Sequence, residues 1–257
     1  AIQSYWRFMN EQLFNHVDIP AGNFHVPDGT VLSSQLAEHC LEYERKIEEA
    51  GGLDFQLLGI GGNGHIGFNE PGSLENTRTR LMMLDQSTRV AAKTDFGGEL
   101  IKVPKKAITL GVAKILQAKR IVLLAWGERK APMIADAVEG TVSAQNPSSY
   151  LQKHPNALFV IDEAAGSGLK RMKTPWLVED VEWTNSMTKK AVTSLSLNLE
   201  KSLLKLTNED YNDNGLSDLL ALHGNAYDIN IDIFNQLQRT ITGWPGGKPN
   251  ADDTHRP

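Results

Sequence analysis

The sequence predicts an α/β fold with a Rossmann-like, mainly parallel β-sheet and flanking helices, followed by a C-terminal helical extension. Up to about residue 165, short apolar runs of the kind that form buried strands alternate with helical patterns. After that point only helical patterns follow. A glycine-rich turn with polar side chains comes directly after the first apolar run, where open α/β sheets place their sites. The predicted organisation is an α/β domain of residues 1–165 and an extension of residues 166–257.

The expected elements of the first domain can be placed from apolar periodicity and turn signals. An amphipathic helix starts near Tyr5, and a second helix is expected over residues 33–50, where Gly51 and Gly52 end it. We expect a buried strand over residues 55–60 and the clearest buried strand over residues 120–126. The other expected elements are a strand over 77–84, helices over 103–118, 129–138 and 149–153, and a last strand over 157–161.

The extension shows no β-type run. Met187, Ala191, Leu195 and Leu199 recur every four residues and indicate a long helix. Two more helices are expected over residues 216–222 and 227–241, before a Pro- and Gly-rich linker at 243–250. A helical pattern starts almost at residue 1 with no strand before it. We therefore expect the chain to be a segment of a longer protein, and to lack the first strands of its sheet.

The bulk composition restricts the class of protein. Of the 257 residues, 40% are hydrophobic and 22% are charged, which is typical of a globular chain. The net charge of −5 argues against a nucleic-acid surface, and no apolar run approaches the roughly 18 residues that span a bilayer. The single cysteine, Cys40, rules out an intramolecular disulfide and a four-cysteine zinc site. We expect a cytoplasmic protein without a nucleic-acid or membrane partner.

The stretch from residue 57 to residue 71 contains the strongest functional signal. The apolar run breaks into glycines, and Asn63, His65, Asn69 and Glu70 follow within a few residues. A glycine-rich loop can double back, so His65 and Glu70 can meet. A histidine held by a carboxylate can transfer protons near neutral pH. The hypothesis is an acid–base site at the end of this strand.

Two other motifs have weaker support. Gly59, Gly61 and Gly64 match a dinucleotide-binding fingerprint, but that motif needs a helix directly after it, and Gly67 and Pro71 break any helix there. The run from residue 210 to 215 resembles the start of a calcium loop, yet its twelfth position lacks the required glutamate. A polar turn is the better interpretation of that run.

Lys130 is a candidate anion ligand. It lies four residues after the strand at 120–126, beside Gly127 and near the start of the next expected helix. A lysine in that place can reach an anion at the helix N-terminus. A solvated surface lysine is the competing interpretation.

At these residues the sequence resembles a known family. Gly62-Asn-Gly-His-Ile-Gly-Phe-Asn-Glu-Pro71 is similar to the signature of glucosamine-6-phosphate deaminases. The likeness covers about residues 4–165 and implies the fold of deaminases and ribose-5-phosphate isomerases. It continues through Ser4-Tyr-Trp-Arg-Phe-Met9, Phe14-Asn-His-Val-Asp-Ile-Pro20, Thr77-Arg-Thr-Arg80, Ala107-Ile-Thr-Leu-Gly-Val112, Gly127 with Lys130, Ala137-Val-Glu-Gly140 and Leu151-Gln-Lys-His-Pro155.

The resemblance implies an activity and a set of roles. Family members open the ring of glucosamine 6-phosphate, isomerise it through an enediol and release ammonia to give fructose 6-phosphate. By position, His65 resembles the ring-opening acid–base, Glu70 the carboxylate that orients it, and Asn63 an assisting residue. The substrate-binding residues are predicted to be Lys130, which resembles a phosphate ligand, together with Gly61, Gly62, Gly64 and Asn69. We expect no cofactor and no metal, a phosphosugar as substrate, and a homo-oligomer.

Two departures from the family pattern keep alternatives open. The family carries a Gly-Gly-Thr phosphate loop and an enolising aspartate before the segment that matches Ser4–Met9, and an Asp-Glu-Tyr triplet occurs nowhere in this sequence. A family arginine that helps to hold phosphate falls near Thr94, where Lys93 is a weak substitute because it lacks the guanidinium fork. A sugar-phosphate sensor without turnover, and a phosphogluconolactonase-like enzyme, are the alternative functions.

The extension resembles a specific part of longer proteins. Residues 174–257 are similar to the middle of deaminase-like proteins in which a de-N-acetylase-like domain follows. The resemblance places no zinc hydrolysis on these residues.

Overall fold

The computed structural model describes residues 4–242, and the side chains of residues 4–240. The chain divides into two compact units, one up to Leu169 and one from Lys170 onward. The predicted domain boundary between residues 165 and 166 lies four residues before this division. The tail at 243–250, predicted to be a linker, lies outside the described residues.

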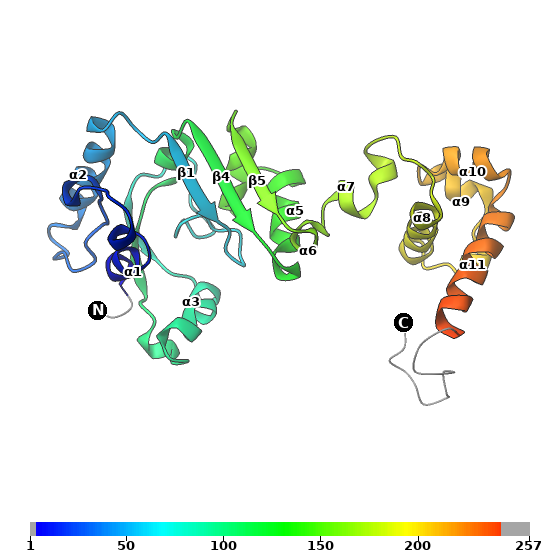
Figure 1. Cartoon of the computed structure of the whole chain (residues 1–257), viewed down its shortest axis with the longest axis horizontal. Helices are drawn as coiled ribbons and strands as arrows, with labels where there is room; N and C mark the ends of the chain where they lie inside the picture. Colours follow the sequence, from blue (N-terminus) through cyan, green and yellow to red (C-terminus); the bar gives the residue numbers. More distant parts are fainter. Residues whose placement is uncertain (1–3, 243–257) are drawn as a thin grey trace. The chain divides into compact units, whose positions relative to one another are not determined.

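A parallel sheet forms the centre of the first unit, in agreement with the predicted α/β fold. It contains β1 (Phe55–Gly59), β4 (Arg120–Ala125) and β5 (Ala157–Ile161), in the order β1-β4-β5 (Figure 1). Both strand pairs are parallel. The carboxyl ends of the strands therefore meet at one edge, and the loop that follows β1 lies at that edge.

One face of the sheet carries the hydrophobic core. Ile121 and Leu123 point to this face from β4, and both are fully buried. Residues of α4 (Val112–Leu116) and α5 (Ala131–Glu139) complete the same cluster, with Ile115 and Ile134 at 1% and 0% exposure. Burying each such side chain contributes about 1.5–3 kcal/mol, so this layer holds β1 and β4 in register.

The opposite face of the sheet is largely open among the described residues. Phe55 and Leu57 of β1 are 53% and 54% exposed, and Leu158 and Val160 of β5 are each 46% exposed. The register places Leu57, Val122 and Leu158 in one row across this face. The prediction of a buried strand over residues 55–60 was therefore wrong for every second residue, because described helices cover only one face.

A second prediction, a helix over residues 103–118, was also wrong. Residues Lys106–Thr109 form β3, which pairs antiparallel with β2 (Arg80–Met83), and the helix α4 starts only after Gly111. Ile108, Val112 and Ile115 have helical spacing, but β3 is too short to show the alternation of a strand. The pairing of Leu81 with Ile108 decides the conformation, and such tertiary pairing overrides local propensity.

The other helices of the first unit frame the sheet and the β2–β3 pair. Helix α1 (Tyr5–Gln12) is capped by Ser4, and α2 (Leu36–Glu49) lies close to the predicted range of 33–50. Helix α3 (Gln86–Ala92) was not predicted. The remaining short helices are Phe14–His16, Ala21–Asn23, Lys93–Phe96, Leu100–Lys102, Glu128–Lys130, Pro147–Lys153 and α6 (Glu163–Gly166).

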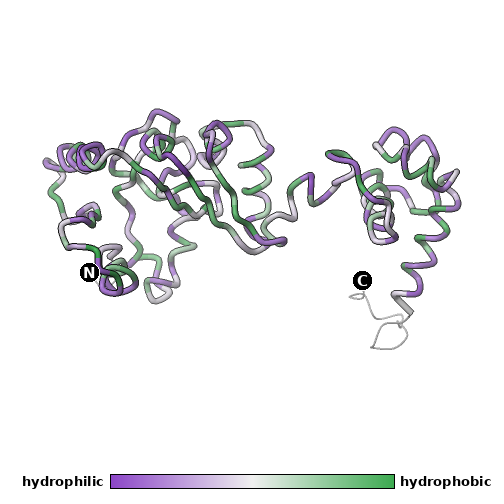
Figure 2. The backbone as a smooth tube through the Cα atoms, turned by 45° about the horizontal axis from the view of Figure 1, so that its top comes forward, coloured by the Kyte–Doolittle hydropathy of each residue, from purple (hydrophilic) through white to green (hydrophobic). Residues whose placement is uncertain are grey.

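The second unit is helical, as predicted. Four helices surround its core: α8 (Asn185–Asn198), α9 (Asn208–Asp213), α10 (Ser217–His223) and α11 (Ala226–Thr242). The short helices α7 (Lys170–Lys173), Pro175–Leu177 and Leu203–Lys205 also belong to it. Hydrophobic and hydrophilic residues alternate along these helices (Figure 2). The polar turn expected at 210–215 is partly helical, because Thr207 and Asp210 form a capping box that starts α9.

A buried polar pair stabilises this helical unit. The Tyr211 hydroxyl donates to Oδ1 of Asn230 at 2.8 Å, and the Asn230 amide donates to the carbonyl of Leu206 at 2.8 Å. Tyr211 is 0% exposed, and burial raises the pKa of its hydroxyl. The hydroxyl therefore stays protonated and acts as a donor at all physiological pH values.

Removing this hydroxyl should destabilise the second unit. In Tyr211→Phe the Oδ1 of Asn230 stays buried without its donor, which costs about 1–3 kcal/mol. Tyr227→Phe is the matched control, because Tyr227 is 68% exposed. Urea denaturation followed by circular dichroism measures both changes. Equal stability of the two variants would contradict the role of the pair.

Candidate active site

The loop after β1 brings the predicted polar residues together. Its backbone turns at Gly61, whose amide donates to the carbonyl of His65 at 2.9 Å, and at Gly64, which has a φ of +85°. A Cβ atom on residue 61 would overlap the imidazole ring of His65, and one on residue 64 would overlap the Asn146 side chain. Both positions therefore need glycine. The loop folds back so that the ring of His65 lies against the backbone of Gly61.

His65, Asn63 and Glu70 form one hydrogen-bonded group. Nδ1 of His65 lies 2.7 Å from Oδ1 of Asn63, and Nδ2 of Asn63 donates to Oε2 of Glu70 at 2.8 Å. Oε2 of Glu70 lies 3.3 Å from Nδ1 of His65. The resemblance implied that Glu70 orients the imidazole ring and that Asn63 assists it. In the structure the Asn63 amide is its nearest partner, and Glu70 lies slightly farther away.

This arrangement assigns a tautomer to the neutral imidazole. Because the Asn63 amide donates through Nδ2 to the Glu70 carboxylate, its oxygen faces His65. An oxygen can only accept, so Nδ1 of His65 carries the proton. Nε2 then carries the lone pair and can act as a base.

Burial and charge set the protonation state of His65. Burial lowers the pKa of His65, and the Glu70 carboxylate partly opposes this effect; Lys130 adds a further lowering. The result is a pKa below the usual value of about 6.5. Because the neutral form persists down to that lowered pKa, His65 is available as a base at pH 7. Glu70 is only 3% exposed, and its Oε1 accepts from the backbone amide of Asp85 at 3.2 Å.

Lys130 lies close enough to this group to act electrostatically on His65. It is at the end of the short helix Glu128–Lys130, directly before α5, and its Nζ donates to the carbonyl of Ile60 at 2.7 Å. One of its three protons is used in this bond, which leaves two for an anion. Burial lowers the pKa of Lys130. Lys93, the weaker candidate, is exposed on the segment after α3.

The structure places the other predicted residues differently. Asn69 is 0% exposed, and its amide donates to the carbonyls of Ile66 and Leu110, while its oxygen accepts from Arg80. These contacts hold the loop, so Asn69 lies beneath the site and not at its surface. Gly62 is exposed and a Cβ there would meet no atom within 4 Å.

Helix α3 contributes residues that the sequence did not predict. The Thr88 hydroxyl lies 3.3 Å from Nδ1 of His65, and Ser87 lies 3.5 Å from Nδ2 of Asn63. No local pattern links them to the loop, because 23 residues separate Thr88 from His65. The one sequence signal that could have indicated α3 is Asp85, a typical N-cap residue, which accepts from the Ser87 amide.

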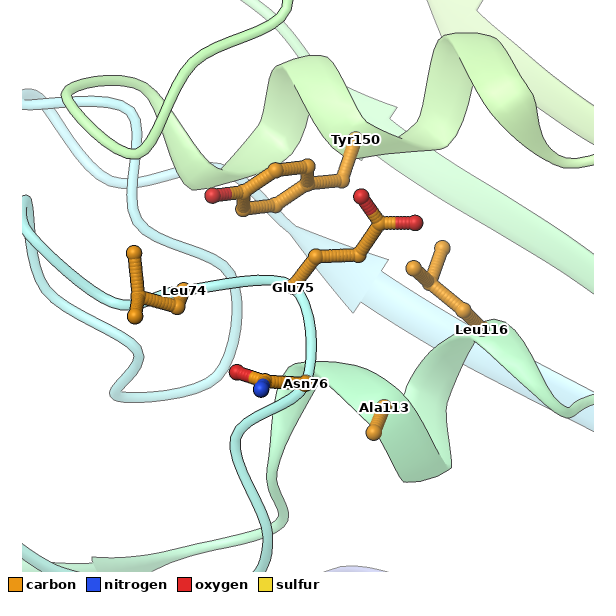
Figure 3. A pocket seen from close by; sticks show the side chains of 6 residues that line it. All are labelled: Leu74, Glu75, Asn76, Ala113, Leu116 and Tyr150. Carbon is orange, nitrogen blue, oxygen red and sulfur yellow. The ribbon is translucent and has the colours of Figure 1, made fainter.

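A separate depression of about 540 Å³ lies elsewhere on the first unit. Figure 3 shows its lining, with Tyr150 above Glu75, and Leu74, Asn76, Ala113 and Leu116 around them. None of its lining residues belongs to the His65 group. Within residues 4–242 no cluster of three or more His, Cys, Asp or Glu side chains could hold a metal ion, and no helix is long and apolar enough to cross a membrane.

The fold and the site define the class. A histidine with a fixed tautomer, held by an amide and a buried carboxylate at the carboxyl edge of a parallel sheet, is how an α/β enzyme prepares a proton-transfer group. The chain belongs to the family of glucosamine-6-phosphate isomerases and 6-phosphogluconolactonases, whose family model matches residues 2–160.

Curated relatives agree with this assignment. The chain is 52% identical over all its 257 residues to a glucosamine-6-phosphate deaminase-like protein of Bacteroides thetaiotaomicron, of which it covers 39%. It is 47% identical over 169 residues to a glucosamine-6-phosphate deaminase of Rhodopirellula baltica, covering 66% of each chain. For the deaminase of Shewanella woodyi the identity is 52% over 167 residues, 65% of this chain and 62% of the relative. The chain thus spans between 39% and 66% of these three relatives.

Solved structures show the same fold. A monomeric glucosamine-6-phosphate deaminase is similar with a TM-score of 0.63 and 39% identity, over 65% of this chain and 68% of that one. A 6-phosphogluconolactonase from Trypanosoma cruzi shares the fold at a TM-score of 0.50 and 19% identity, over 66% and 67% of the two chains.

Proposed function

We propose that the natural protein that carries this chain converts glucosamine 6-phosphate and water to fructose 6-phosphate and ammonia, and that His65 opens the sugar ring. The observation that supports this most strongly is the group of His65, Asn63 and Glu70 beside Lys130. Relatives named as glucosamine-6-phosphate deaminases, at 42–52% identity, support the choice of reaction.

The proposed role of His65 follows from its tautomer. Ring opening removes the proton from the hydroxyl on C1, forms the carbonyl, breaks the bond between C1 and O5, and protonates O5. Nε2 of neutral His65 can take the first proton and deliver it to O5, so the histidine is unchanged at the end. While the imidazole of His65 is charged, Asn63 accepts from Nδ1–H and the Glu70 carboxylate stabilises the positive charge. Removal of the proton on C2 is assigned to no residue of this chain.

The proposed phosphate ligand is Lys130. Its ammonium is half-buried, and a cation in such a place attracts a phosphate more strongly than a solvated one does. Gly62 leaves the backbone of the loop open to the sugar, whereas Gly61 and Gly64 leave room for the side chains of His65 and Asn146. Asn69 supports the site by holding the loop against Arg80.

Replacing Lys130 should weaken substrate binding more than it slows the chemistry. For Lys130→Gln we expect KM to rise about 10- to 100-fold, because a charge-assisted hydrogen bond of about 1.5–3 kcal/mol is lost. The kcat value should change less. Arg129→Gln is the control, because Arg129 is the exposed neighbour. A KM that is unchanged in Lys130→Gln would remove Lys130 from the phosphate site.

The direct test of the proposed function is a product assay on the purified natural protein. Glucosamine 6-phosphate should give fructose 6-phosphate and ammonia in equal amounts. Calorimetric binding of glucosamine 6-phosphate without turnover would instead indicate a sugar-phosphate sensor. Hydrolysis of 6-phosphogluconolactone without ammonia release would indicate the lactonase alternative. Either of these two outcomes would overturn the proposal.

Two expectations from the sequence stay predictions. A homo-oligomer is still expected, although the solved relative is described as monomeric. Size-exclusion chromatography with light scattering would decide this question. The cytoplasmic location also stays a prediction.

A further inference from the structure

Thr88 lies against Nδ1 of His65, the ring nitrogen opposite the proposed base Nε2. It is in the first turn of α3 and only 8% exposed, and its Oγ1 lies 3.3 Å from Nδ1 of His65. Asn63 Oδ1 lies 2.7 Å from the same nitrogen. Oε2 of Glu70 is also 3.3 Å away, so three oxygen atoms lie within 3.3 Å of Nδ1, and that of Thr88 is the one that comes from α3.

The position of Thr88 is fixed by the rest of the site. Asp85 caps α3 by accepting from the amide of Ser87, and the amide of Asp85 itself donates to Oε1 of Glu70. The carboxylate that supports Asn63 thus also holds the start of the helix that carries Thr88. A hydroxyl held in this way can limit rotation of the imidazole about its bond to Cβ.

The hydroxyl also has a defined hydrogen-bonding role. Nδ1 carries a proton in the tautomer that Asn63 imposes, so Thr88 can only share in accepting it. A further acceptor favours the positively charged imidazolium that forms when Nε2 takes a proton. The charged groups that face His65 are Glu70, Lys130 and Asp85.

We propose that Thr88 is a positioning residue for the ring-opening step: its hydroxyl holds the imidazole plane of His65 and is a further acceptor for Nδ1–H, beside Asn63 and Glu70. This inference rests on the proposed function, because it assigns a role within the same acid–base group. Thr88 itself does not contact the reacting atoms.

A pair of substitutions separates this role from simple packing. Thr88→Val keeps the shape of the side chain and removes the hydroxyl, whereas Thr88→Ser keeps the hydroxyl and removes a methyl group. If the hydroxyl positions His65, the valine variant is the impaired one. If Thr88 only fills space, the serine variant is the impaired one and valine is tolerated.

Two measurements on the natural protein test the proposal. In Thr88→Val we expect kcat for glucosamine 6-phosphate to fall about 3- to 10-fold, while KM stays within about twofold. NMR titration of His65 should show its pKa lowered by about half a unit to one unit, because the charged ring loses an acceptor. Thr88→Ser should stay close to the wild type in both measurements.

The outcomes distinguish this proposal from the proposed function. Equal effects of valine and serine, or a raised pKa of His65 in Thr88→Val, would overturn the role of Thr88. If the wild-type protein does not release ammonia, the proposed function fails, and the NMR titration of the two variants still decides whether Thr88 holds His65.

Discussion

Replacing His65 with alanine should lower the turnover of glucosamine 6-phosphate by about 10²- to 10⁴-fold, which is the usual loss for an acid–base group. The imidazole of His65 is the only group assigned to the transfer of a proton from O1 to O5 of the sugar. Its removal leaves Glu70 and Asn63 with no ring to orient. KM should change much less, because the imidazole contributes to the reaction more than to the binding of the phosphate.

His223→Ala is the matched control for this loss. His223 is the last residue of α10 in the helical unit, and it is exposed. Its replacement should leave turnover unchanged. If His65→Ala released ammonia at the rate of the wild-type protein, His65 could not be the ring-opening residue.

Adding a single methyl group at Gly61 should be almost as damaging. A Cβ atom there would overlap the imidazole of His65, so in Gly61→Ala the ring must move away from its position. Displacing a catalytic group by about 1 Å can cost about 100-fold in rate. We expect a fall in kcat of about that size, with the protein still folded.

Gly59→Ala provides the comparison within the same segment. Gly59 ends β1, and a Cβ atom on it would meet nothing within 4 Å. That variant should keep the wild-type rate, and both variants should show the same circular dichroism spectrum. Wild-type turnover in Gly61→Ala would mean that the ring position seen in the structure is not the active one.

The sequence was most informative where local chemistry determines the structure. The apolar run at 120–125 had to be a buried strand, and it forms β4 in the middle of the sheet. The glycines at 61 and 64 predicted a tight loop, and the structure brings Asn63, His65 and Glu70 together in that loop. These three residues lie close together in one short segment, so their contacts depend little on the packing of distant parts of the chain.

The predictions that were wrong, and the contacts that were not predicted, involve segments that are distant in the sequence. Residues 106–109 form a strand because they pair with residues 80–83, although their apolar spacing indicated a helix. Thr88 reaches His65 only because α3 packs over the loop, and neither residue carries a local signal of the other. The role of Asn63 as the nearest partner of His65 depends on amide orientation, which spacing alone does not give.

The open face of the sheet also depends on tertiary structure. Parallel sheets are normally covered on both faces, and here Leu57 and Leu158 are half-exposed on one of them. The chain spans at most 66% of the three curated relatives compared above. A run of apolar residues indicates a strand, but it does not show which face of that strand the described helices cover.

The role of His65 as the acid–base group can be tested by measuring the pH dependence of kcat/KM for glucosamine 6-phosphate beside an NMR titration of His65 in the same natural protein. Because burial lowers the pKa of His65, the base form is lost only as the pH falls below about 6.5. We expect kcat/KM to fall at acidic pH with the same pKa as His65, below 6.5. If the fall of kcat/KM at acidic pH had a pKa different from the pKa of His65 measured by NMR, His65 could not be the acid–base group.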